Sequence, residues 1–198
     1  SGTVSFSIDS VSSVSADTTL ISGAFPITGA AMNLVDGSSS LGIVQMTILS
    51  SSGSSTLNVD PVSLQEITKF RVAETSSKEG VNLYKWVFYN YGNAAASDYT
   101  DVTLTAPDGT VVAIAQPVGQ YVTFVPATPY FIDKGLTKDF TIKAKVVGGT
   151  TKTIKLVVYN DYDLDIRGAT TGVSIIPTAL PPDTTFPVGN SYNLTTIG

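Results

Sequence analysis

The segment KDFTIKAKVVGG, residues 138–149, decides the fold class of this protein. Apolar residues occupy its even positions from Phe140 to Val146, and polar residues occupy the odd positions between them. A period of two is that of a β-strand with one buried and one solvated face. The same period, carried by Val, Ile, Thr, Tyr and Phe, recurs through most of the chain, and we predict an all-β protein.

Turn residues near this segment predict two hairpins. TTKTIKLVVYN, residues 150–160, repeats the alternation after Gly148-Gly149, and DVTLTAPDGTVVAIA, residues 101–115, turns at Asp108-Gly109. Glycine adopts the positive φ that such turns require. About eleven short strands separated by turn signals are typical of a β-sandwich. The remaining predicted strands are Val4–Ile8, Leu20–Phe25, Gly42–Leu49, Val62–Val72, Val81–Tyr89, Tyr121–Val125 and Val173–Ile176.

Composition changes along the chain and predicts three parts. Ser and Thr supply 24 of the first 68 residues, whereas every Tyr and the single Trp come later. We therefore place a Ser/Thr-rich acidic β segment at residues 1–66 and an Ig-like antiparallel β-sandwich at residues 67–178. Residues 179–198 contain three prolines without alternation, which predicts an extended tail.

Several function classes are excluded by composition. The chain has no Cys and no His, so thiol chemistry, thiolate metal sites and the usual base of a serine nucleophile are absent. We expect no enzymatic activity; two convergent carboxylates are the remaining catalytic alternative. With net charge −5 and pI near 4.5, nucleic acid is not an expected partner. No apolar run reaches the roughly 18 residues of a transmembrane segment.

Two stretches carry a resemblance to a known family. They are TPYFIDKGLTKDFTIKAKV, residues 128–146, and YNDYDLDIRGATTG, residues 159–172. Together with residues 70–112, they resemble modules repeated in large surface-layer-like proteins of ultrasmall candidate-phyla bacteria. The resemblance implies an Ig-like β-sandwich at the cell surface that builds an extracellular coat, stalk or filament. It implies copies of the chain as partners and brings no catalytic residues.

Asp161, Asp163 and Asp165 occupy alternate positions in NDYDLDIRGATTG, residues 160–172. An EF-hand counted from Asp161 would need Gly and Glu where the chain has Ile166 and Gly172, so that motif is absent. If the preceding strand continues, the three carboxylates share one face and repel each other. Two interpretations remain open. Either Arg167 and nearby lysines neutralise a solvated face, or oxygens from another loop complete a Ca²⁺ site, which the resemblance favours.

The aromatic segment NLYKWVFYNY, residues 82–91, also has two interpretations. Alternation places Tyr84, Trp86 and Phe88 on one side, where they would fill a sandwich core. Alternatively, the rings stack on surface glycans. The second interpretation makes a non-catalytic carbohydrate-binding or adhesin module the alternative function.

The opening segment GTVSFSI, residues 2–8, places Val4, Phe6 and Ile8 on one face of a strand. This strand can pair within its own chain. It can also add to an exposed sheet edge of another copy, where main-chain hydrogen bonds supply affinity and the three apolar side chains fill pockets. The second possibility predicts a structural subunit that associates with itself.

Overall fold

The computed structural model describes residues 2–17, 21–34, 40–49, 56–189 and 195–198. These residues form β-strands and two short 3-10 helices, η1 (Val11–Ser13) and η3 (Asp161–Asp163), and contain no α-helix. The all-β prediction is confirmed. Contacts divide the chain into two units, residues 1–39 and residues 40–198. Among the described ranges, no helix has the length and hydropathy needed to span a membrane.

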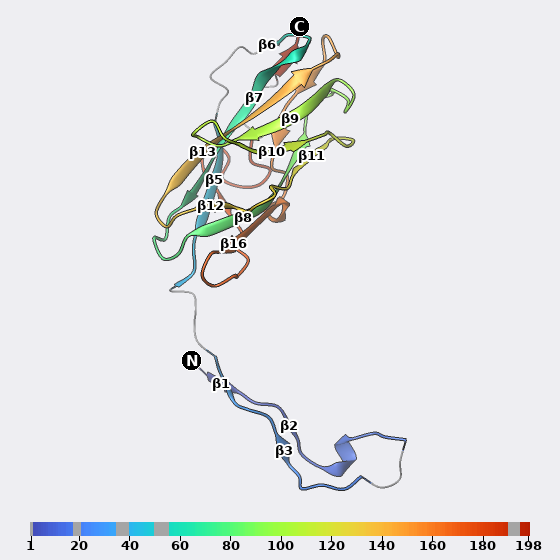
Figure 1. Cartoon of the computed structure of the whole chain (residues 1–198), viewed down its shortest axis with the longest axis vertical. Helices are drawn as coiled ribbons and strands as arrows, with labels where there is room; N and C mark the ends of the chain where they lie inside the picture. The colour runs from blue at the N-terminus through green and yellow to red at the C-terminus, as the bar shows by residue number, and fades with distance from the viewer. Residues whose placement is uncertain (1, 18–20, 35–39, 50–55, 190–194) are drawn as a thin grey trace. The chain divides into compact units, whose positions relative to one another are not determined.

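The first unit is built on a two-stranded antiparallel ribbon, drawn in blue in Figure 1. Strand β1 (Gly2–Val4) pairs with β4 (Met32–Leu34), and β2 (Ser7–Ile8) pairs with β3 (Ile27–Thr28). Between the two pairs, the Gly29 amide donates to the Phe6 carbonyl over 2.8 Å. We call residues 2–8 and 27–34 the ribbon.

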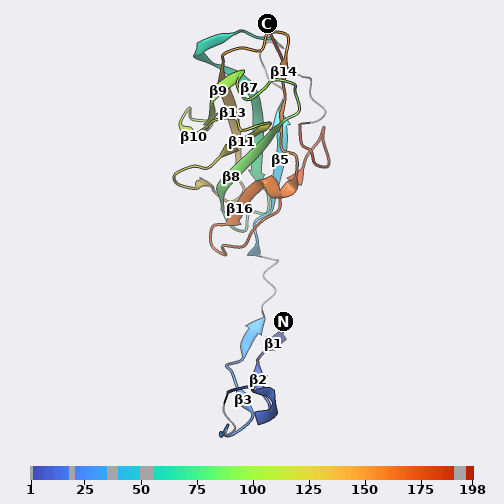
Figure 2. The same ribbon diagram turned by 90° about the vertical axis from the view of Figure 1, so that its right-hand side faces the viewer.

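The second unit is a sandwich of two sheets packed face to face (Figure 1 and Figure 2). The first sheet has the order β10-β9-β13-β7-β5-β17. Its strands are β5 (Val44–Leu49), β7 (Asp60–Glu74), β9 (Tyr99–Thr105), β10 (Val111–Ala115), β13 (Thr137–Val146) and β17 (Thr178–Ala179). All of its pairs are antiparallel except β17 with β5.

The second sheet is centred on β8, which pairs with β11 and β12 and with β15 and β16. These strands are β8 (Val81–Asn90), β11 (Tyr121–Phe124), β12 (Tyr130–Ile132), β15 (Leu156–Val157) and β16 (Leu164–Gly168). A small third sheet joins β6 (Thr56–Leu57), β14 (Thr153–Ile154) and β18 (Thr195–Ile197). The order β5-β7-β13-β9 corresponds to A-B-E-D of an immunoglobulin sheet, with β8 as strand C of the facing sheet.

The core lies between the two large sheets. The even positions of β13 from Phe140 to Val146 are fully buried, as the alternation predicts. The centre of the Phe140 ring lies 5.2 Å from the ring centre of Phe70 on β7, 5.9 Å from that of Trp86 on β8 and 5.0 Å from that of Tyr130 on β12. Phe140 thus joins side chains of both sheets, and the prediction of an Ig-like sandwich is confirmed.

Strand pairing differs from the sequence prediction at one turn. The hairpin at Asp108-Gly109 forms, because β9 and β10 pair on either side of it. Gly148-Gly149 does not join paired strands: β13 pairs with β7 and β9, and the chain then passes to β14 in another sheet. Both edges of β13 are already occupied, so the next strand cannot add to it.

Two other predicted strands are also wrong. Residues 21–25 form no strand, and Leu20 lies outside the described residues. The stretch Val173–Ile176 contributes only a bridge from Ser174 to Arg167.

The predicted part boundaries also differ from the structure. Residue 66 lies inside β7, and β5 before it contributes Val44, Met46 and Ile48 to the core. Ser and Thr are frequent on both sides of the real division because they also suit the solvated positions of sandwich strands. The region 179–198 is not only an extended tail: Val188 and Ile197 are buried, and β18 pairs with β14 and β6.

Two buried glutamates fasten the beginning of the sandwich unit to its loops. Both oxygens of Glu74 accept backbone N–H groups: Oε1 from Ile43 and Ser76 over 3.2 and 2.9 Å, and Oε2 from Ser77 and Gly135 over 3.0 and 2.6 Å. Burial acts to raise the pKa of Glu74, but hydrogen bonds, led by the one from the Ser76 hydroxyl, outweigh it and hold the pKa below its ordinary value.

Glu79 repeats this arrangement on the other side of the β7–β8 turn. It accepts the Gly42, Thr170 and Thr171 amides and the Thr171 hydroxyl over 2.9–3.2 Å. Burial again acts to raise its pKa, and the hydrogen bonds, led by those from Thr171, lower it overall. A carboxylate that accepts several N–H groups is strongly favoured over its protonated form. Glu79 therefore ties residues 42, 170 and 171 together most strongly while it is charged.

We expect acid to weaken this unit. A carboxyl group with a lowered folded-state pKa contributes stability that is fully present above its unfolded value, 4.5 for both glutamates, and is lost as the pH falls through the folded value. Urea unfolding at a series of pH values should show the free energy of unfolding decreasing below pH 4.5. The double variant Glu74→Gln, Glu79→Gln should show a smaller decrease, and an unchanged slope would contradict this assignment.

Candidate functional site

The ribbon exposes its apolar side chains and buries none. Within residues 2–17 and 21–34, no side chain is fully buried. In these two ranges the large apolar residues that are 40% to 73% exposed are Phe6, Ile8, Ile27, Met32 and Leu34 in the ribbon and Val11 outside it. A two-stranded ribbon without a core is at best marginally stable in water. Burying one such side chain stabilises a protein by roughly 1.5–3 kcal/mol. Contact with a partner that covers these side chains would therefore stabilise the ribbon.

The predicted association residues Val4, Phe6 and Ile8 all lie in the ribbon. Val4 pairs with Met32 and Ile8 pairs with Ile27, so the opening strand has a partner in its own chain. Phe6, between β1 and β2, is 73% exposed. A lone donated strand is therefore replaced by a paired ribbon, and association through these residues stays a prediction.

Charge separates the two units. In residues 1–39 the charged residues are Asp9, Asp17 and Asp36, and all eleven Lys and Arg residues lie in residues 69–198. Three of the five acidic residues of the predicted segment 1–66 thus lie in the unit that contains the ribbon. Residues 40–198 contain thirteen acids and eleven bases, so the sandwich unit has a net charge of −2 and offers the acidic unit no opposite charge overall.

The edge of the sandwich at β10 carries no charged residue. Strand β10 ends the six-stranded sheet and, in the described part of the chain, pairs only with β9. No charged residue occurs between positions 109 and 132. Natural edge strands are usually protected by charges, prolines or bulges; β10 has an irregular register between Val111 and Ala113 but carries no charge. We call residues 111–125, which contain β10, its following loop and β11, the apolar edge. Its exposed large apolar side chains are Val111, Ile114, Val118, Tyr121 and Val125.

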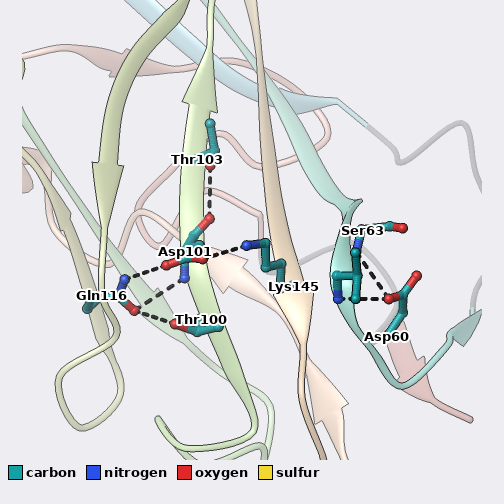
Figure 3. Close-up of polar contacts among 8 residues, drawn as sticks. Asp60, Ser63, Thr100, Asp101, Thr103, Gln116 and Lys145 are labelled. Carbon is teal, nitrogen blue, oxygen red and sulfur yellow. Dashed lines mark hydrogen bonds and ion pairs between the residues drawn. The ribbon is translucent and has the colours of Figure 1, made fainter.

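A polar clamp holds the end of β10 in place (Figure 3). Gln116 donates to Asp101 over 2.8 Å and accepts from the Thr100 hydroxyl over 2.6 Å, and Lys145 pairs with Asp101 over 2.9 Å. Hydrogen bonds from Lys145 and then Gln116 lower the pKa of Asp101. Asp101 has φ of 50°, in the left-handed region that Asp tolerates better than most residues. A fixed edge loses less entropy when another strand adds to it.

The three aspartates do not share a strand face. Asp161 and Asp163 lie in helix η3, and only Asp165 lies in β16. Strand β15 already ends at Val157, and Asp163 accepts the Asn160 backbone N–H over 2.8 Å in the turn that follows. The predicted continuation of the strand is wrong for this reason. In the ranges that the structure describes, no group of three or more acidic side chains is placed to hold a metal ion. Calcium binding stays a prediction.

Arg167 neutralises one of these aspartates. Its guanidinium donates two hydrogen bonds to Asp165, over 2.9 and 2.8 Å, and they hold the pKa of that carboxyl below its ordinary value. The guanidinium carbon also lies 4.6 Å from the centre of the Tyr84 ring, a cation–π contact. Arg167 thus acts on Asp165 as the solvated-face interpretation expects.

The aromatic segment contributes two of its five rings to the core. Trp86 and Phe88 are fully buried, so they cannot stack on a glycan. Tyr84 does not join them. The register with β16 shifts by one residue at this point, because Lys85 faces Asp165 while Leu83 faces Ile166. This bulge turns Tyr84 outward, where it meets Arg167.

Comparisons with known proteins place the chain in no family. No family model matches, and no curated protein is significantly similar. A glycoside hydrolase of family 123 from Clostridium perfringens is similar over 70% of this chain and 27% of its own, with 11% identity and a TM-score of 0.30. BcpA, the major pilin subunit of Bacillus cereus, is similar over 70% and 41%, with 16% identity and a TM-score of 0.27. The chain thus spans less than half of each, and TM-scores this low support no inference about function.

Proposed function

We propose that this protein is a structural subunit of an extracellular surface assembly, a coat, stalk or filament, in which copies associate by strand pairing. The observation that carries the proposal is the ribbon, which exposes its large apolar side chains and buries no residue. The resemblance to surface-layer-like modules supports the same role. We propose no catalytic step, since the chain has neither His nor Cys to activate a nucleophile.

The ribbon of one copy binds the apolar edge of another. Strand β10 offers unpaired main-chain groups, and Val111 and Ile114 offer apolar surface to Phe6 and its neighbours. The absence of charge from residue 109 to 132 means that the acidic ribbon unit meets no like charge there. Because the ribbon and the edge are different surfaces, the contact is head-to-tail and extends into an open chain unless the rotation closes a ring.

We expect Ile114→Lys to prevent assembly. The change places a charge on the apolar edge, which is how natural edge strands avoid pairing. Removing apolar burial at one such residue costs roughly 1.5–3 kcal/mol, which raises the concentration needed for assembly by about 10- to 100-fold. Light scattering and electron microscopy of the full chain would show polymers for the unmodified protein and monomers for Ile114→Lys.

Two further variants separate the ribbon from the edge. Phe6→Lys should also give monomers, whereas Ile176→Lys, at a 66% exposed position outside the apolar edge, should leave polymers intact. Monomers of the unmodified protein at high concentration would refute the proposed function. Polymers of Ile114→Lys with monomers of Phe6→Lys would keep the function and reject the apolar edge as the surface that binds the ribbon.

A further inference from the structure

Four tyrosines gather on the outer face of the five-stranded sheet. Tyr89 lies on β8 and alternates with the buried Phe88, and Tyr121 on β11 is its cross-strand partner. Tyr91 and Tyr159 follow the ends of β8 and β15. Together the four tyrosines line a hollow of about 290 Å³, which we call the tyrosine cup. This volume is near the lower limit for small-ligand sites, about 300 Å³.

The rings of the tyrosine cup contact one another. The centre of the Tyr89 ring lies 5.1 Å from that of Tyr121, 5.4 Å from Tyr159 and 5.6 Å from Tyr91. The ring centres of Tyr91 and Tyr159 are 6.1 Å apart. The rings meet at steep angles, 82° between Tyr89 and Tyr91 and 66° between Tyr89 and Tyr121, as aromatic pairs in direct contact commonly do. The cup therefore presents both faces and edges of aromatic rings around the hollow.

The polar groups of the cup are hydroxyls. All residues that line it are tyrosines, so no charged side chain is among them. Tyr89 donates its hydroxyl hydrogen bond to Gln120, which fixes the central ring. In the described part of the chain, the hydroxyls of Tyr91, Tyr121 and Tyr159 make no hydrogen bond, and these residues are 42–49% exposed. An uncharged ligand with an apolar face and a rim of hydroxyls matches this surface.

We propose that the tyrosine cup binds a sugar ring of a neutral polysaccharide. The C–H face of the sugar lies on the aromatic surface, and its hydroxyls bond to the phenol oxygens around it. Tyr89, Tyr91 and Tyr121 lie on or directly after β8 and β11, which pair with each other. The surface is therefore formed before the ligand arrives. The cup shares Tyr121 with the apolar edge, whereas Tyr89, Tyr91 and Tyr159 lie outside that edge, so these three rings would attach an assembled subunit to a glycan matrix.

The test is affinity electrophoresis of the full chain through gels that contain a soluble β-glucan, a mannan or an α-glucan. We expect at least one polysaccharide to retard the protein. Tyr159→Ala and Tyr91→Ala should each weaken the apparent affinity about tenfold, because each removes one ring from the surface. Tyr159→Phe keeps the ring and should retain most of the affinity. Tyr162→Ala, at a 71% exposed position that does not line the cup, is the matched control.

Three outcomes would overturn the proposal. The first is that none of the three polysaccharides retards the protein. The second is that Tyr159→Ala is retarded as strongly as the unmodified chain. The third is that Tyr159→Ala prevents polymer formation in light scattering, because the cup would then belong to the contact between copies. A proline-rich peptide that binds while all three polysaccharides fail would assign the cup to a polypeptide ligand instead.

Discussion

Replacement of Phe140 by alanine is expected to lower the free energy of unfolding by about 3–5 kcal/mol. Phe140 is fully buried, and its ring contacts Phe70, Trp86 and Tyr130 from both sheets. Its removal leaves a cavity at the point where the sheets meet, and strands on either side cannot close it without moving the backbone. Urea denaturation followed by Trp86 fluorescence measures the loss.

Phe6→Ala is the matched control for this prediction. The same side chain is removed from the ribbon, where it is 73% exposed. We expect its effect on the unfolding of the sandwich to be close to zero when the protein is dilute enough to be monomeric. An equal loss for both variants would contradict the assignment of Phe140 as the centre of the core.

Glu74→Gln is expected to cost about 2–4 kcal/mol of stability, although it conserves the shape of the side chain. Both carboxylate oxygens accept two backbone N–H groups, so either orientation of the glutamine amide points its NH₂ at two donors. The hydrogen-bond donors to Glu74 among the described residues are four backbone amides and the Ser76 hydroxyl, and the amides are held in place by the backbone.

Asp139→Asn provides the comparison, again measured by urea denaturation. Asp139 pairs with Arg71 at the surface, where both side chains are more than 40% exposed, and such pairs contribute at most about 1 kcal/mol. A loss for Glu74→Gln no larger than that for Asp139→Asn would show that the backbone donors of Glu74 find water instead.

Much of the fold is predictable from local patterns. The alternation in residues 138–149 correctly assigns the buried face of β13, and Asp108-Gly109 correctly assigns the β9–β10 hairpin. Gly148-Gly149 carries an equally strong turn signal and yet joins strands of different sheets. The two glycines carry no information about the pairing of β13, which already has a neighbour on each side. The division at residue 39 is likewise hidden, because Ser and Thr continue into β5 and β7.

The candidate sites show the same limit. The uncharged run from residue 109 to 132 is visible in the sequence and could have identified the apolar edge, but its position at the end of a sheet could not. The tyrosine cup depends on the register that places Tyr121 opposite Tyr89 and on a turn that brings Tyr159 beside them. The spacing of Asp161, Asp163 and Asp165 predicted that they share one strand face. They do not, because Asp161 and Asp163 lie in a turn that the hydrogen bond from Asn160 to Asp163 closes.

The sequence by itself determined that this protein is all β, which faces of its strands are buried, and that its first unit is acidic. These properties follow from the period of side chains along a strand and from composition, both of which are local. Only the tertiary structure decided which strands pair, that the ribbon buries nothing and that β10 is left at an edge. The reason is that pairing joins segments far apart in the chain, so a strand's free edge depends on where every other strand has gone.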